Sequence, residues 1–238
     1  MSHRLVFILY RRPELDRQAF QHYWTTTHAP LVKSVARTLG ITGYQQVHTV
    51  GDGPGDATSF DGVAELWFDP AAAEGTADER RQAGTMLLED EARFIDLAAS
   101  PIFLGEEREV SNRHREGKRT TSVVYRKAGT TRAQFRAHWG DVHGPLVVAH
   151  PEVFNGARYV QVHAPDNAET YPAAIARNAP PPPDGVAETY FADLANVAPE
   201  LRDPVLAELV TDTAKFVDTD RSVSAPGRVD VIIGHDGI

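Results

Sequence analysis

The sequence predicts an α+β fold made of two ferredoxin-like βαββαβ modules whose antiparallel sheets pair into an intramolecular α+β barrel. Two observations lead to this prediction: a motif that occurs twice, and an order of strand-like and helix-like segments that repeats with it. The chain has 238 residues, of which 42% are hydrophobic, so two modules can each bury a core. A sheet covered by helices on one face needs a partner for the other face, and a second copy supplies one.

The repeated motif is Phe-x-x-x-Trp-x-x-x-His-x-Pro-Leu-Val. Shifting the sequence by 115 residues superimposes Trp24 on Trp139 and His28 on His143. Three further motifs recur, namely Tyr-x-Gln-Val-His, Asp-Gly-Val-Ala-Glu and Asp-x-Ala-x-Phe-x-Asp. They occupy residues 44–48 and 159–163, 61–65 and 184–188, and 90–96 and 212–218. The duplication therefore covers nearly the whole chain.

The hydrophobic periodicity alternates between strand and helix within each copy. In the first copy it predicts strands at 4–10, 42–50, 61–69 and 101–110, and helices at 14–29 and 71–98. In the second it predicts strands near 120–126, 157–163, 185–192 and 226–234, and helices near 131–149 and 199–218. These patterns give a first module at 1–110, a linker at 111–118 and a second module at 119–238.

The second copy carries an additional segment at 166–184. It contains four consecutive prolines, which cannot donate hydrogen bonds to a strand ladder. We therefore expect an extended loop or lid in this region.

Alternation along the strands predicts which side chains face the barrel interior. On the second strand of each copy, valine is expected to pack against the helices, which leaves tyrosine, glutamine and histidine facing inward as substrate-binding groups: Tyr44, Gln46, His48, Tyr159, Gln161 and His163. On the third strand, Glu65 and Glu188 are expected to face inward too. The alternatives are a solvated rim for the strand residues and exposed charges for the glutamates, because a slip of one residue reverses every assignment.

The histidine of the repeated motif lies just before a proline. Pro30 and Pro145 lack the N–H group that a helix needs, so each helix is expected to kink or restart beside His28 or His143. A histidine held there suits acid–base catalysis, and the alternative is a histidine that caps the broken helix end. Trp24 is on the same helical face, as is Trp139 in the second copy. These aromatic residues suit the core better than a ligand platform, although they are candidates for substrate contact.

Composition excludes several classes of function. The chain has no cysteine, which rules out thiolate nucleophiles and thiolate metal sites, and its histidine spacings do not match a helical zinc pair. The net charge of -9 without a basic block argues against nucleic-acid binding. No apolar run is long enough for a membrane span, and the lack of an export signal favours the cytoplasm. We expect no metal and no cofactor.

Together, these motifs resemble the EthD-like family of dimeric α+β barrel proteins, in both copies. The resemblance implies a ferredoxin-like module that pairs its sheet with a second module around a hydrophobic pocket. It also implies a functional role for the histidines at 28 and 143. The wider fold group includes isomerases, dehydratases, cofactor-free oxygenases and haem-binding proteins, so the resemblance does not fix the reaction.

The leading functional hypothesis is a cofactor-independent enzyme that acts on a small hydrophobic or aromatic carbonyl compound. In this hypothesis His28, His143, Glu65 and Glu188 are the catalytic candidates for a dehydration, cyclisation or isomerisation. The alternative is a non-catalytic protein that binds a small ligand. Residues 25–27 differ from residues 140–142, so the two sites need not be equally active, and the chain is expected to be a monomer or homodimer.

Overall fold

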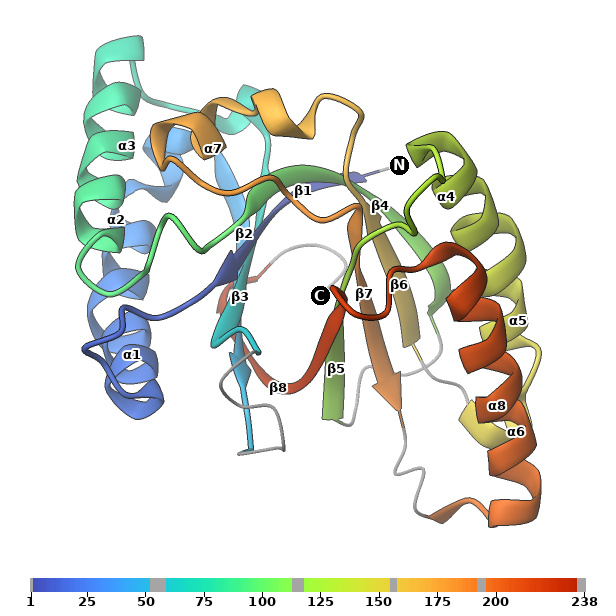
Figure 1. Ribbon diagram of the computed structural model, residues 1–238. Coiled ribbons are helices and arrows are strands. Elements are labelled where there is room, and N and C mark those ends of the chain that lie inside the picture. The colour runs from blue at the N-terminus through green and yellow to red at the C-terminus, as the bar shows by residue number, and fades with distance from the viewer. Residues whose placement is uncertain (1, 52–58, 113–117, 155–157, 192–195, 235–238) are drawn as a thin grey trace. The chain divides into compact units, whose positions relative to one another are not determined.

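The computed structural model describes residues 2–51, 59–112, 118–154, 158–191 and 196–234 (Figure 1). The chain forms two compact units. The first unit comprises His3–Leu104, Asn167–Pro182 and Arg228–Ile238, and the second comprises Met1–Ser2, Gly105–Asp166 and Pro183–Gly227. The segment at 167–182, which belongs to the second copy by sequence, is therefore part of the unit built by the first copy.

The first copy has the predicted βαββαβ order, with the first helix divided by a π-helical turn. Its elements are β1 (Ser2–Leu9), α1 (Arg17–Tyr23), the π-helical turn η1 (Trp24–His28), α2 (Ala29–Leu39), β2 (Ile41–Thr49), β3 (Gly62–Phe68), η2 (Pro70–Ala72), α3 (Ala77–Glu91) and β4 (Ile102–Asn112). Helix α3 begins at Thr76, whose side chain and that of Glu79 form a reciprocal capping box. Helix α2 ends at Gly40, which adopts the left-handed conformation.

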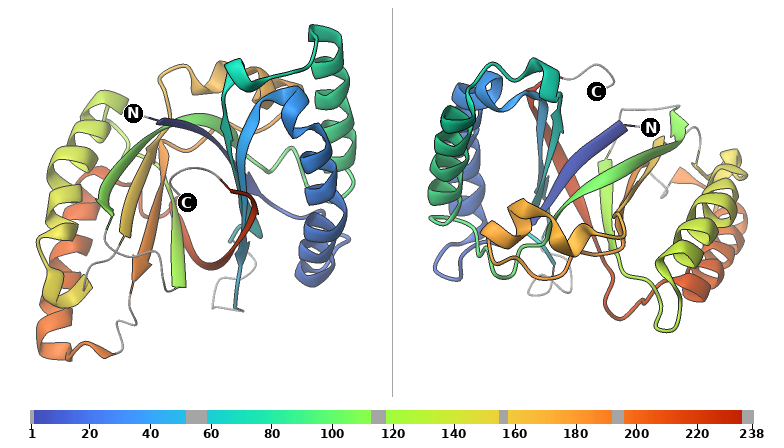
Figure 2. Two further views of the ribbon diagram at one scale, coloured as in Figure 1. Left: turned by 180° about the vertical axis from the view of Figure 1, so that it is seen from behind. Right: turned by 90° about the horizontal axis from the view of Figure 1, so that it is seen from above.

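The second copy repeats this order and adds short helices. Its elements are β5 (Lys118–Val124), α4 (Arg132–His138), the π-helical turn η3 (Trp139–His143), α5 (Gly144–Val148), α6 (Pro151–Phe154), β6 (Arg158–His163), η4 (Ala168–Thr170), α7 (Pro172–Ala176), β7 (Gly185–Phe191), α8 (Pro199–Phe216) and β8 (Val223–Ile233). Helices α4, α5 and α8 lie side by side over the sheet of β5, β6 and β7 (Figure 2).

Three sequence-based boundaries need correction. The segment at 166–184 is not extended throughout, because it contains η4 and α7 before the prolines. The helix predicted at 71–98 is shorter, since α3 covers only Ala77–Glu91. The first two residues of the predicted linker belong to β4, and residues 113–117 lie outside the described part of the chain.

The order of hydrogen-bonded strands confirms the predicted fold class. The order is β1-β3-β2-β8-β5-β7-β6-β4, which closes on itself as a barrel. Within the first unit β3 pairs antiparallel with β1 and β2, and within the second unit β7 pairs in the same way with β5 and β6. Each copy thus has the strand neighbours of a ferredoxin-like sheet. In the described residues, no helix combines the length and hydropathy needed to cross a bilayer.

The predicted helix break is a π-helical turn in both copies. The N–H of Ala29 donates to the carbonyl of Trp24, five residues earlier, and Gly144 donates to Trp139 in the same way. Pro30 follows in the first turn of α2, where a missing N–H costs little. The turn admits one extra residue before the proline, so the helix continues instead of ending.

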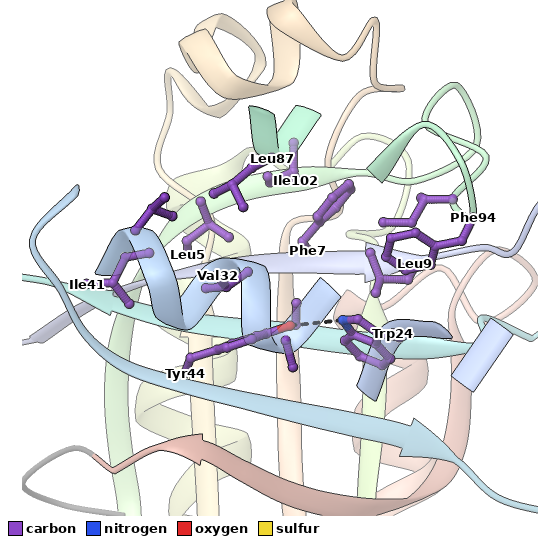
Figure 3. Packing of buried hydrophobic residues seen from close by; sticks show 14 of the residues in the cluster. Leu5, Phe7, Leu9, Trp24, Val32, Ile41, Tyr44, Leu87, Phe94 and Ile102 are labelled. Carbon is purple, nitrogen blue, oxygen red and sulfur yellow. Dashed lines mark hydrogen bonds between the residues drawn. The ribbon is translucent and has the colours of Figure 1, made fainter. Parts of the chain in front are cut away.

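Aromatic side chains form the centre of each core, and Figure 3 shows the cluster of the first unit. In the first unit the ring of Phe20 lies 5.7 Å from that of Trp24 and 5.5 Å from that of Phe94. Phe135 has the same relation to Trp139 and Phe216 in the second unit. The interpretation of Trp24 and Trp139 as core residues is therefore confirmed.

A buried carboxylate holds together the end of the first sheet. Asp61, just before β3, accepts hydrogen bonds from the backbone N–H of Arg11 at 2.8 Å and from Nε of Arg17 at 3.0 Å, and it also pairs with the guanidinium of Arg11. Asp184 does the same with Arg126 and Arg132 in the second unit.

We predict that Asp61→Ala lowers the free energy of unfolding by about 3 kcal/mol, because it leaves partly buried guanidinium groups and a backbone N–H without their acceptor. Urea unfolding monitored by circular dichroism measures this change. The control is Glu14→Gln, which removes an exposed pair with Arg12 and should leave the stability almost unchanged. Equal effects of the two substitutions would contradict the prediction.

Candidate functional site

The first unit contains a cavity of about 450 Å³ between its sheet and its helices. Apolar side chains from β1, β3 and α3 form most of the wall, including Leu5, Phe7, Leu66 and Leu87. His28 also lines the cavity, at the end of the π-helical turn. The site therefore combines a mainly apolar wall with an imidazole ring.

His28 is held by a carboxylate from α3. Its Nδ1 lies 2.8 Å from Oδ2 of Asp90, and the other oxygen of Asp90 accepts a hydrogen bond of 2.8 Å from the hydroxyl of Tyr23. His28 and Asp90 are both buried. Burial, followed by the contact with Asp90, raises the pKa of Tyr23, so the phenol stays protonated and keeps donating.

This arrangement fixes which nitrogen of His28 can act on a ligand. An ionised carboxylate only accepts hydrogen bonds, so Nδ1 carries the proton of the neutral ring and Nε2 has the free lone pair. Asp90 also stabilises the imidazolium that forms when Nε2 takes up a proton. His28 and Asp90 thus have the geometry of a general base and its orienting carboxylate.

Helix α7 forms part of the wall of the first cavity through Pro172, Ala173 and Ala176. Tyr171 and Arg177, at the two ends of α7, both line it. The guanidinium of Arg177 binds Glu91 at the end of α3 through two hydrogen bonds of 2.7 and 2.8 Å. This bidentate pair neutralises the charges of Arg177 and Glu91, and Arg81 at the rim pairs with Asp78, so the site suits an uncharged ligand better than an ionic one.

The residues of β2 lie on the other face from the one predicted. Trp24 donates from Nε1 to the hydroxyl of Tyr44 at 2.9 Å, which places Tyr44 against the helices (Figure 3). Gln46 donates to the Trp24 carbonyl at 3.1 Å, and the ring of His48 lies 4.7 Å from that of Trp24. The assignment was wrong by one residue of register, so Val47 is the side chain on the opposite face.

The same correction applies to β6. Tyr159 accepts a hydrogen bond from Trp139 at 2.8 Å, and Gln161 donates to the Trp139 carbonyl at 2.8 Å. The ring of His163 lies 4.5 Å from that of Trp139, tilted by 54°. Among the six strand candidates, Tyr44 lines the first cavity and Tyr159 the second, each together with its tryptophan. The glutamines and histidines instead support the π-helical turns.

Glu65 and Glu188 lie on the face of the sheet opposite to the histidines. Residues 64 and 66 line the first cavity, so Glu65, between them, points away from it. It is fully buried and faces Arg4 at 3.5 Å, while Glu188 lies 3.4 Å from Arg119. The prediction that both glutamates face inward, away from the helices, is therefore confirmed, and the exposed alternative is excluded. Their predicted grouping with the strand tyrosines and the motif histidines on one face is wrong.

The second unit has a cavity of about 410 Å³ at the corresponding place. His143 lines it, and its Nδ1 lies 3.0 Å from Oδ2 of Asp212 on α8. Where the first unit has Tyr23, the second has His138, whose Nε2 lies 3.0 Å from the other oxygen of Asp212. Lys215 adds a contact of 3.2 Å.

The pKa values of His143 and Asp212 in the second unit are both lowered. Burial lowers the pKa of His143 below its ordinary value, although the hydrogen bond to Asp212 opposes the change. Burial disfavours ionised Asp212, but hydrogen bonds from His143, His138 and Lys215 outweigh it and lower the pKa of that carboxyl. A neutral His143 beside an ionised Asp212 is therefore the favoured state near neutral pH.

The pairing of histidine with aspartate was missed in the sequence. Asp90 and Asp212 begin the recurring Asp-x-Ala-x-Phe-x-Asp motif, and that recurrence was the available signal. Sequence alone does not say that this helix lies against the π-helical turn. Among the described residues, no group of three or more histidine, aspartate or glutamate side chains is placed to hold a metal ion.

Comparison with known proteins identifies related domains. The model of the EthD domain matches residues 12–98 and 127–220. No curated protein sequence matches the chain.

Several solved structures resemble the chain. A Fusobacterium nucleatum protein provisionally named a monooxygenase aligns with a TM-score of 0.54 at 10% identity, over 97% of this chain and 94% of that chain. An EthD family protein from Bacillus halodurans is 28% identical over 45% of this chain and 100% of its own, with a TM-score of 0.33. Chlorite dismutase from Candidatus Nitrospira defluvii in complex with imidazole aligns at 7% identity and a TM-score of 0.47, over 95% and 91%. The similarity to the Fusobacterium nucleatum protein supports the fold alone.

We predict that the buried histidines of β2 and β6 make folding stability depend on pH. Burial, as the largest cause, lowers the pKa of both His48 and His163 to about 4. Between an unfolded value near 6.5 and this folded value, only the unfolded chain binds the proton, so stability falls as the pH falls. In that pH range each of these histidines should lower the free energy of unfolding by about 1.4 kcal/mol for every unit by which the pH falls.

Urea unfolding at pH 7.5 and 5.5 measures this effect. On lowering the pH from 7.5 to 5.5, the free energy of unfolding of the His48→Gln/His163→Gln variant should fall by about 2–3 kcal/mol less than that of the native chain. The control, His22→Gln, removes an exposed histidine and should leave the difference unchanged. An unchanged pH dependence in the double variant would exclude these two histidines as its source.

Proposed function

The chain belongs to the EthD domain family, and on this basis we propose that it is a cofactor-independent enzyme that transfers protons on a small, uncharged, hydrophobic carbonyl compound. The observation that carries the proposal is the hydrogen bond between Nδ1 of His28 and Asp90 beside an apolar cavity. The reactions that fit are dehydration, cyclisation and isomerisation, since each needs a proton removed from one atom and returned to another.

The size and chemistry of the cavity support this substrate class. A volume of about 450 Å³ falls within the range of small-molecule sites. Its wall is mainly aliphatic and aromatic, and the charge of Arg177 is neutralised by Glu91. The hydroxyl of Tyr44 is the donor suited to orient a carbonyl, and the Nε2 lone pair of His28 is the base.

The roles of the residues follow from their positions. Nε2 of His28 removes a proton from a carbon next to the carbonyl, and Asp90 stabilises the imidazolium formed in that step. Tyr23 holds Asp90 in place through its hydroxyl. The apolar wall excludes water, which strengthens the electrostatic interaction between the imidazolium and the developing enolate.

A second candidate is a protein that binds the same kind of ligand without changing it. The cavity alone would suffice for this role, and the observation that favours it is the apolar wall that α7 adds to the ligand space. The two candidates differ in whether His28 accelerates a chemical step.

We predict that the protein accelerates exchange of the α-hydrogens of 2-tetralone, an uncharged bicyclic ketone, with solvent deuterium, as followed by proton NMR. His28→Gln should lower the rate to that of the second site, and His28→Gln/His143→Gln should lower it at least about 100-fold, because the double substitution removes both candidate bases. Asp90→Asn should also lower it. His22→Gln, an exposed histidine on the same helix, should leave the rate unchanged. Binding of 2-tetralone without exchange in the native protein would instead support the binding role.

We also predict that exchange catalysed by the second site persists at lower pH than an ordinary histidine allows. Because burial lowers the pKa of His143, the ring stays neutral and basic below pH 6.5. In the His28→Gln background, the remaining rate should fall with a midpoint below 6.5, and His143→Gln should abolish it. A midpoint above 6.5 would contradict the prediction.

A further inference from the structure

We infer that the cavity of the second unit is a separate ligand site that takes a more polar compound than the first cavity, namely an aromatic ring bearing hydroxyl groups. The inference rests on the proposed function, because it takes the first cavity as the site for an apolar compound. On this inference, the two cavities of the duplicated chain bind ligands of different polarity.

The two cavities share their anchoring residues. His143, Trp139 and Tyr159 line the second cavity at the positions that His28, Trp24 and Tyr44 occupy in the first. The volumes, about 410 and 450 Å³, are close, so a ligand of similar size fits either cavity.

The walls differ at three strand positions. Ser122 replaces Phe7, Thr189 replaces Leu66, and Ser224 replaces Ile102. The strand register supports the first correspondence, since Phe7 pairs with Ala64 and Ser122 pairs with Ala187 at the matching position. All six side chains line their own cavity, so three apolar surfaces have become three hydroxyl groups.

Two of these hydroxyls form a pair on neighbouring strands. Ser224 donates to Ser122 through a hydrogen bond of 2.8 Å, and the two residues are opposite each other in the pairing of β5 with β8. Thr189 is buried on β7, the other neighbour of β5. Thr189 lies opposite Thr120, two residues along from the position that faces Ser122, so the three hydroxyls belong to three neighbouring strands of the same wall. They can donate to and accept from ring hydroxyls.

The second cavity is also more open on its helical side. Val210 of α8 lines it and is 69% exposed, whereas its counterpart in the first unit, Leu88, lines the cavity beneath α7 and is half-buried. Thr213 stands where the first cavity has Glu91, the residue that binds Arg177 of α7. A polar ligand can therefore keep part of its hydration at this rim.

Hydroxyl groups in a cavity wall select for ligands that can bond to them. An apolar ligand would strip water from the hydroxyls without replacing the hydrogen bonds, which disfavours binding. A hydroxylated ring replaces those bonds. Each hydrogen bond of this kind changes affinity severalfold, so the preference of the two cavities should differ by about tenfold or more.

The test uses the full chain and two probes that differ by two hydroxyls, toluene and 5-methylresorcinol. The indole N–H signals of Trp24 and Trp139 report the two cavities separately in proton–nitrogen correlation spectra, and Trp24→Phe and Trp139→Phe assign them. We expect 5-methylresorcinol to shift the Trp139 signal at a concentration at least about tenfold lower than the Trp24 signal. Toluene should show the opposite order.

A variant with the hydroxyls removed provides the decisive comparison. Ser122→Ala/Thr189→Val/Ser224→Ala nearly preserves shape, and it should weaken the effect of 5-methylresorcinol on Trp139 about tenfold while leaving its effect on Trp24 unchanged. An unchanged affinity at Trp139, or equal titration of both signals by 5-methylresorcinol, would overturn the inference. Failure of proton exchange would count against the proposed catalysis alone, because these signals report binding without any reaction.

Discussion

The hydrogen bond from a strand glutamine to the tryptophan carbonyl in the π-helical turn is the interaction on which each site depends. In the first unit Gln46 donates to the Trp24 carbonyl and also to the hydroxyl of Tyr44, which itself accepts from the Trp24 indole. The turn is thereby fixed to the sheet at its backbone and at its ring. His28 ends that turn, so its ring faces Asp90 and the cavity only while the turn keeps its five-residue geometry.

Much of the fold follows from the sequence because its signals are local. The repeated motif, the alternation of strands and helices, and the proline after each histidine identify the βαββαβ order and the disturbed helix. In contrast, the sequence did not correctly predict which side chains of β2 and β6 face the helices. A strand buried on both sides has no polar face to indicate its register, and Tyr44, Gln46 and Val47 are all buried. The polar residues lie against the helices because the π-helical turn presents a carbonyl and an indole N–H there.

Only some of the residues of the site could be predicted from the sequence. The histidines were evident from their motif, but Asp90 and Asp212 come from a helix more than sixty residues away, and only packing brings them within 3.0 Å. Glu65 and Glu188 illustrate the opposite case. They are buried and charged, as functional residues often are, yet they pair with Arg4 and Arg119 across the sheet from the histidines. A buried charge indicates that a partner exists and not which face it occupies.

The placement of residues 167–182 in the first unit has a consequence for how the duplicated chain can change. A segment encoded in the second copy covers the cavity of the first, and residues 228–238 also belong to the first unit. Cutting the chain between its repeats would leave the first copy without its cover and without part of its unit. The two halves can acquire different ligands by substitution, but they can no longer be separated by recombination at the repeat boundary. Each half of the duplicated chain keeps its own histidine and aspartate, but the cavity of the first half is covered by residues 167–182, which come from the second.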